Sequence, residues 1–143
     1  MDARSVRLVQ DSFDKVAMSG RAVAETFYSE LFKIDPSLQT MFSPNMIEQH
    51  KKLIAALMLV VRSLHTPEAI LAPVKLLAVK HVNYGVRPEH YTYVGNALIR
   101  TLHKSLGEEF TPEVRQAWVD AFRMLAGVMK QEAYGGSALR GAA

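Results

Sequence analysis

His81 is the histidine whose neighbours best suit it to bind a metal ion. It lies in the stretch LLAVKHVNYGV (residues 76–86), one helical turn after Leu77 and about two after Val74, so the imidazole falls on an apolar stripe. A neutral imidazole offers a lone pair to a metal. No second histidine stands at the spacing of a zinc site. One protein ligand is enough where a macrocycle supplies the rest, as in haem iron held by a proximal histidine.

The remaining chemistry-bearing residues exclude several common functions. The chain has no cysteine, so disulfides, thiolate metal sites and cysteine nucleophiles are absent. It carries no glycine-rich phosphate loop, no HExxH pair and no G-x-S-x-G elbow. The other histidines are expected at the surface or in structural hydrogen bonds, which is the usual role of a histidine; they are His50, His65, His90 and His103.

Composition indicates a globular protein without a nucleic-acid or membrane partner. The 143 residues are 49% hydrophobic and 22% charged, which suits one domain with a sizeable core. The net charge is +3, but the 17 basic residues are scattered among acidic ones instead of gathering on one face. No apolar stretch at the start is long enough for a signal peptide or a membrane span, so we expect a cytoplasmic protein.

The elements that must position His81 are helices, because apolar residues recur with a period near 3.6 almost throughout. We therefore expect an all-α domain of about seven helices over residues 1–133, with a frayed tail over 134–143. Pro36, Pro88 and Pro112 are boundary signals, as are Gly107 and the capping residue Thr111. The expected helices cover about residues 6–18, 21–34, 46–64, 74–83 and 88–106, and a last helix starts at 112. A tight turn is expected before residue 42.

The order of these segments resembles the globin family, and more narrowly the bacterial single-domain globins related to flavohaemoglobins. The stretches that carry the resemblance are AETFYSELFKIDPSLQTMF (24–42), EQHKKLIAAL (48–57), LLAVKHVNYGVRPEHYTYVG (76–95) and AWVDAF (117–122). Each is modest alone, but their order and spacing together are specific. The resemblance covers about residues 6–132 and implies the globin fold, a helical sandwich around a haem pocket.

The resemblance also implies a set of site residues around haem b. His81 matches the proximal iron ligand, and Phe42 matches the phenylalanine that stacks on the porphyrin. Tyr28 and Gln49 match the distal polar positions, and Leu53 matches the apolar residue over the iron. Further contacts with the cofactor are expected from Leu77, Lys80, Val86, Tyr91 and Val94, with Lys80 and Lys52 as candidates for the propionates.

The distal pair has a chemical purpose in this interpretation. Oxygen held in such a pocket carries partial negative charge, and a tyrosine hydroxyl or a glutamine amide can donate a hydrogen bond to it. In a dry pocket each bond contributes about 1–2 kcal/mol, or about tenfold in affinity. Two alternatives stay open from the residues: Tyr28 packs with its hydroxyl on a backbone carbonyl, or Tyr28 or His50 itself occupies the sixth iron position.

Tyr91 and Glu132 are candidates for a hydrogen-bond network behind His81, which would push electron density onto iron. Glu132 follows Trp118 by fourteen residues, whereas the family pattern places the glutamate one position later, where Ala133 stands. A shift of one residue turns a helical side chain by about 100°. An exposed Glu132 is therefore an equal alternative.

Three functions remain open at this point. The first is reversible binding of oxygen, and of NO and CO, by a monomer or weak homodimer. The second is nitric oxide dioxygenase activity, which would need a separate reductase because the sequence carries no flavin-binding region. The third is a haem-free helical interaction module, against which the joint presence of His81, Phe42, Tyr28 and Gln49 argues.

Overall fold

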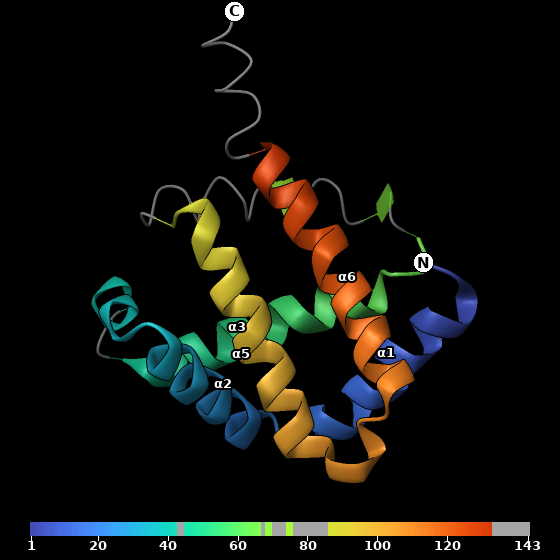
Figure 1. The fold of residues 1–143 in the computed structure, drawn as a ribbon, viewed down its shortest axis with the longest axis horizontal. Helices are drawn as coiled ribbons and strands as arrows, with labels where there is room; N and C mark the ends of the chain where they lie inside the picture. Colours follow the sequence, from blue (N-terminus) through green and yellow to red (C-terminus); the bar gives the residue numbers. More distant parts are fainter. Residues whose placement is uncertain (43–44, 67, 70–73, 76–85, 133–143) are drawn as a thin grey trace, which may run out of the picture.

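The computed structural model describes residues 1–42, 45–66, 68–69, 74–75 and 86–132. This part of the chain is built from α-helices and short 3-10 helices and contains no strand, which confirms the predicted all-α class (Figure 1). The elements are α1 (Ala3–Ala17), α2 (Gly20–Ile34), η1 (Pro36–Met41), α3 (Met46–Arg62), α5 (Pro88–Leu106), η2 (Gly107–Glu109) and α6 (Pro112–Lys130). None of the described helices is long and apolar enough to cross a membrane.

Local sequence signals explain most of these boundaries. The Thr111 hydroxyl accepts a hydrogen bond from the Val114 amide at 3.2 Å, and Pro112 opens α6 behind this cap. Gly107 ends α5 with φ +58°, a conformation that residues other than glycine rarely adopt. α1 begins three residues before the predicted start because the Asp2 carboxylate accepts from the Ser5 amide at 2.7 Å. α3 stops at Arg62, two residues before the predicted end.

The expected short helix over 74–83 falls largely outside the described residues. Only Val74 and Lys75 are described there, and both are helical. His81, Leu77 and Lys80 lie outside the described part of the chain, as does the predicted tail.

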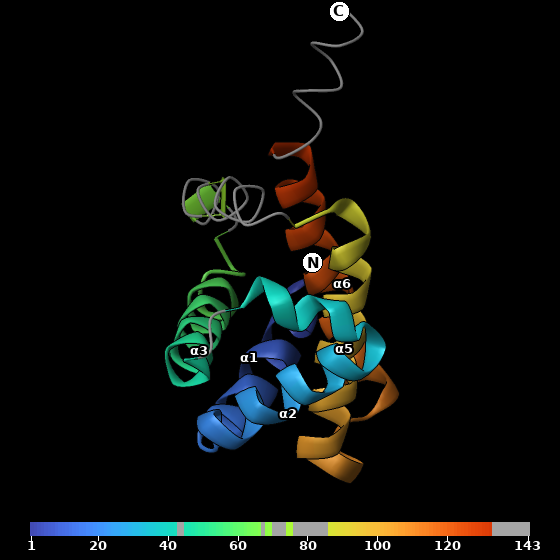
Figure 2. The same ribbon diagram turned by 90° about the vertical axis from the view of Figure 1, so that its left-hand side faces the viewer.

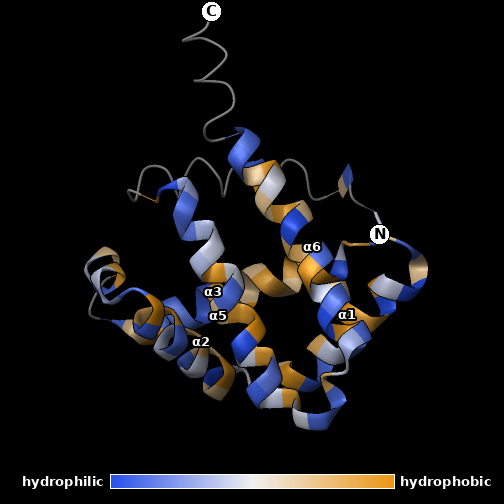
Figure 3. Ribbon diagram, in the orientation of Figure 1, coloured by the Kyte–Doolittle hydropathy of each residue, from blue (hydrophilic) through white to orange (hydrophobic). Residues whose placement is uncertain are grey.

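Two helix pairs hold the described part together. α2 packs along α5, where Ala97 and Thr101 have no exposed surface and are small enough for a close approach of the two backbones. α1 packs along α6, where the buried Trp118 indole donates a 2.8 Å hydrogen bond to the Ser12 hydroxyl. Figure 3 shows apolar and polar residues alternating around the helices, which is the amphipathic pattern that the periodicity predicted.

α3 stands apart from α5 and α6. Among the described residues it packs on α2 and α1 but makes no extended contact with α5 or α6, and Figure 2 shows it on the opposite side of the molecule from that pair. Within the described ranges the buried apolar residues correspondingly form two clusters. The main cluster joins α1, α2, α5, α6 and the end of α3, and a smaller one consists of Val74, Tyr91, Ala126 and Met129.

Candidate functional site

Tyr28 of α2 lies at the centre of the group of residues that the sequence predicts for the distal side. It is buried, and its ring meets Phe42 edge-on at a centroid distance of 5.3 Å. The short helix η1 makes this contact possible: the Asp35 carboxylate accepts from the Ser37 amide, Pro36 starts the turn, and the chain returns to Tyr28 at Phe42. The structure thus brings together two of the predicted site residues.

The Tyr28 hydroxyl points toward the first turn of α3. It donates a long hydrogen bond of 3.5 Å to the main-chain carbonyl oxygen of Gln49. Burial raises the pKa of the Tyr28 phenol above its ordinary value of 10.0, and hydrogen bonding with Gln49 acts in the opposite direction. The phenol is therefore protonated at neutral pH and is a donor.

Gln49 and Leu53 lie one turn apart on α3, so they share a face of that helix, and both are half-buried. The neighbouring His50 is also half-buried, and its ring stacks on Tyr28 with centroids 5.5 Å apart. The proximity of His50 to Tyr28 is a contact that the sequence did not predict. Lys52, a candidate for the propionates, is exposed.

Tyr91 lies at the centre of a second group, which contains the described residues that the sequence predicts for the proximal side. It is buried in the first turn of α5, within the smaller apolar cluster, and Val86 packs against that cluster. Val94, one turn after Tyr91, lies half-buried against the main cluster. The Lys130 ammonium of α6 lies 5.7 Å from the centroid of the Tyr91 ring, within the range of a cation–π contact.

Glu132 is exposed and forms an ion pair with Lys75 at 3.4 Å. This position supports the alternative of a surface carboxylate, while its role behind His81 stays a prediction. His65 and His103 are exposed, as expected. His90 is not simply turned to solvent: its Nδ1 accepts from the Arg87 amide at 3.1 Å and caps α5.

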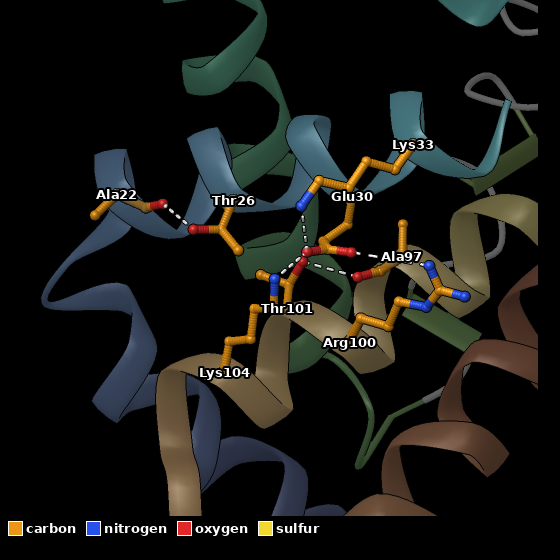
Figure 4. A network of polar contacts seen from close by, with 8 residues as sticks. All are labelled: Ala22, Thr26, Glu30, Lys33, Ala97, Arg100, Thr101 and Lys104. Carbon is orange, nitrogen blue, oxygen red and sulfur yellow. Dashed lines mark hydrogen bonds and ion pairs between the residues drawn. The ribbon is translucent and has the colours of Figure 1, made fainter. Parts of the chain in front are cut away.

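Sequence patterns did not predict the buried carboxylate that the described residues contain. Glu30 of α2 is 4% exposed although it is a carboxylate, and Lys33, Arg100 and Lys104 surround it (Figure 4). A signal for it was present in the sequence, because Glu30 stands three residues after Phe27 and directly before Leu31, both on the inward side of α2.

The described residues fit a flat apolar cofactor such as haem. Phe42, Leu53, Leu57 and Val94 lie against the main apolar cluster and still keep part of their surface exposed. α3, which carries two of them, makes no extended contact with α5, which carries Val94. A buried donor, Tyr28, lies beside this apolar surface. No group of three histidine or carboxylate side chains that could hold a metal ion occurs among the described residues.

The partly exposed apolar side chains on separate helices and the buried Tyr28 hydroxyl beside them are compatible with an apolar cofactor. Comparison with solved structures gives the fold. An engineered carbene transferase from a candidate nitric oxide dioxygenase of Rhodothermus marinus is similar over 99% of both chains, with a TM-score of 0.85 and 26% identity. A bacterial globin from Campylobacter jejuni matches 96% of this chain and 99% of its own, with a TM-score of 0.84 and 23% identity.

The globin family model matches residues 25–129, so the chain belongs to the globin family and is a haem-binding globin. The predicted family and fold are therefore confirmed. The flavohemoprotein of Xylella fastidiosa (strain 9a5c) is 30% identical over 88% of this chain, and that of Rhizobium meliloti is 33% identical over 85%. The chain spans about a third of the length of these curated relatives, 32% and 31% respectively.

Proposed function

We propose that this globin binds oxygen reversibly, together with NO and CO, at a haem b whose iron is held by His81. The bound haem supplies the iron to which a diatomic gas coordinates. The observation that carries the proposal is Tyr28, a buried and protonated hydroxyl whose hydrogen bond to Gln49 is long. A weakly held donor of this kind can turn to a ligand that carries partial negative charge. We assign the globin domain to residues 1–133.

Each site residue has its own role in this proposal. Phe42 and Leu53 supply apolar surface against the porphyrin and keep water away from the ligand, which strengthens each hydrogen bond there. Tyr28 donates to the ligand, and Gln49 supplies a second donor from the facing helix. Val86, Val94 and Tyr91 pack on the other side, and Leu77 and Lys80 complete the cofactor contacts in this proposal.

Two substitutions test the proposal. His81→Ala should abolish stable haem binding, which is measured by the Soret band of the protein after haem addition. Tyr28→Phe should keep the Soret band and raise the oxygen dissociation rate by about tenfold or more, because one hydrogen bond to the ligand is lost. Absence of a Soret band in the unaltered protein would refute haem binding, and an unchanged dissociation rate would refute the role of Tyr28.

The second candidate function is nitric oxide dioxygenase activity. The likeness to the Rhodothermus marinus protein favours it. The reaction joins NO, O₂ and one electron to give nitrate, so sustained turnover needs a reductase as the electron donor. Stopped-flow mixing of the oxygen-loaded protein with NO tests the chemical step, and nitrate formation over many cycles with an added reductase distinguishes an enzyme from a carrier.

A further inference from the structure

The carboxylate of Glu30 is an ionic contact between α2 and α5 that the proposed function does not use. Its side chain is 5% exposed, whereas the three cations around it keep more than half of their side-chain surface in solvent. Lys104 hydrogen-bonds to Oε1, Lys33 approaches Oε1 at 3.5 Å, and Arg100 approaches Oε2 at 3.8 Å (Figure 4). Both oxygens of one carboxylate are therefore occupied.

The partners of Glu30 on α5 limit how far α2 can rotate about its own axis. Arg100 and Lys104 stand one turn apart on α5, so they approach the carboxylate from two points along that helix. Fully buried Ala97 and Thr101 lie beneath them, with the Thr101 hydroxyl bonded to the Ala97 carbonyl oxygen at 2.7 Å. An apolar side chain at position 30 could fill the same space, and such replacements of buried ion pairs are often neutral for stability. An apolar side chain would not form the directional contacts that Glu30 makes with Lys104 and Arg100.

Glu30 and Tyr28 are two residues apart on the same helix, which places them about 200° apart around its axis. Glu30 therefore faces α5 while Tyr28 faces Phe42 and α3. The phenol oxygen lies roughly 9 Å from the helix axis, the sum of the backbone radius and the side-chain length, so turning α2 by about 5° moves it by about 0.8 Å.

A movement of that size matters at Tyr28. Its hydroxyl is already 3.5 Å from the Gln49 carbonyl oxygen, at the outer limit of a hydrogen bond. A small turn of α2 thus decides how closely the hydroxyl approaches any ligand beside it. We propose that Glu30 is a positioning residue, which fixes the rotation of α2 through Lys104 and Arg100 and so sets the strength of the hydrogen bond from Tyr28 to the bound gas. This inference rests on the proposed function.

The test is a double-mutant cycle on the haem-loaded protein. Glu30→Gln keeps the size of the side chain but removes the charge that holds the cations, and it should raise the oxygen dissociation rate by about three- to tenfold, as expected for a weakened hydrogen bond. In the Tyr28→Phe background the same change should have less than about a twofold effect, because the group through which Glu30 acts is gone. Glu25→Gln is the matched control, since it breaks the exposed Arg21–Glu25 pair on the same helix.

The outcomes separate the two proposals. If Tyr28→Phe itself leaves the rate unchanged, the distal role of Tyr28 fails. If Tyr28→Phe raises the rate and Glu30→Gln does not, or if Glu30→Gln acts equally in both backgrounds, only the positioning role fails. If the Glu30→Gln protein does not fold, Lys104→Gln is used in its place, because it alters an exposed partner of Glu30. Lys104→Gln should likewise raise the oxygen dissociation rate only when Tyr28 is present.

A measurement without haem adds an independent readout. In the haem-free chain labelled with ¹³Cζ-tyrosine, Tyr28→Phe identifies the signal of Tyr28. Glu30→Gln should shift this signal, and Glu25→Gln should not. An identical Tyr28 signal in the Glu30→Gln and Glu25→Gln variants would overturn the inference.

Discussion

The hydrogen bond between Trp118 and Ser12 fastens α6 to α1, and Ser12→Ala removes its acceptor. Both residues are buried, at 3% and 6% exposure, so water does not replace the lost partner of the indole. Ser12 also donates to the Leu8 carbonyl oxygen at 2.6 Å, but this contact lies within α1 and does not join the helices.

The expected magnitude follows from these contacts. A buried donor left without an acceptor costs about 1–3 kcal/mol of the free energy of unfolding. Alanine has the higher helix propensity and returns about 0.5 kcal/mol at an interior helical position. We therefore expect Ser12→Ala to lower the free energy of unfolding by about 0.5–2.5 kcal/mol.

Urea unfolding followed by far-UV circular dichroism measures this loss. Ser29→Ala, at an exposed position of α2, is the control and should change the free energy of unfolding by less than about 0.5 kcal/mol. In a Trp118→Phe background the indole donor is absent, so Ser12→Ala should no longer be costly. An equal loss in both backgrounds would refute the reasoning.

Three further expectations concern pH and packing. The hydrogen bond from Lys104 holds the pKa of the Glu30 carboxyl below its ordinary value of 4.5. The ionised carboxylate therefore contributes to stability above pH 4.5, and this contribution is lost as the pH falls through the lower pKa of the folded state. Glu30→Gln should accordingly flatten the dependence of stability on pH below about pH 4.5 in acid unfolding experiments. Burial raises the pKa of Tyr28 above 10.0, so stability should decline as pH rises beyond about 10, and Tyr28→Phe should reduce that slope in alkaline urea titrations. A Cβ at Gly95 would lie 2.6 Å from Phe122, so Gly95→Ala should lower the melting temperature, whereas Gly127→Ala, where nothing lies within 4 Å, should leave it unchanged or raise it.

The sequence predicted the helices well because their signals are local. Caps such as Thr111, the proline at position 88 and the glycine at 107 act within one turn, and the apolar period repeats over each helix. The resemblance to globins assigned Tyr28 and Phe42 to one pocket, so their proximity was also expected.

The ionic contact at Glu30 could not be predicted in the same way. Its partners Arg100 and Lys104 stand about seventy residues later in the chain, and they meet Glu30 only because α2 crosses α5. The stack of His50 on Tyr28 likewise depends on how α3 lies against α2. Such pairings follow from tertiary packing, which periodicity in one segment does not encode.

The division of the buried apolar residues into two clusters has a consequence for how the protein opens. Phe122 and Leu125 flank both clusters, and in the part of the chain that the structure describes the smaller one holds four buried side chains. Among the described residues little buried apolar area lies at that end, so we expect the ends of α5 and α6 around Tyr91 to exchange their amide hydrogens through a partial opening that leaves the α2–α5 crossing intact. A cofactor that contacts both clusters would raise the free energy of this opening, and loss of haem would then begin as a local event at one end of the fold.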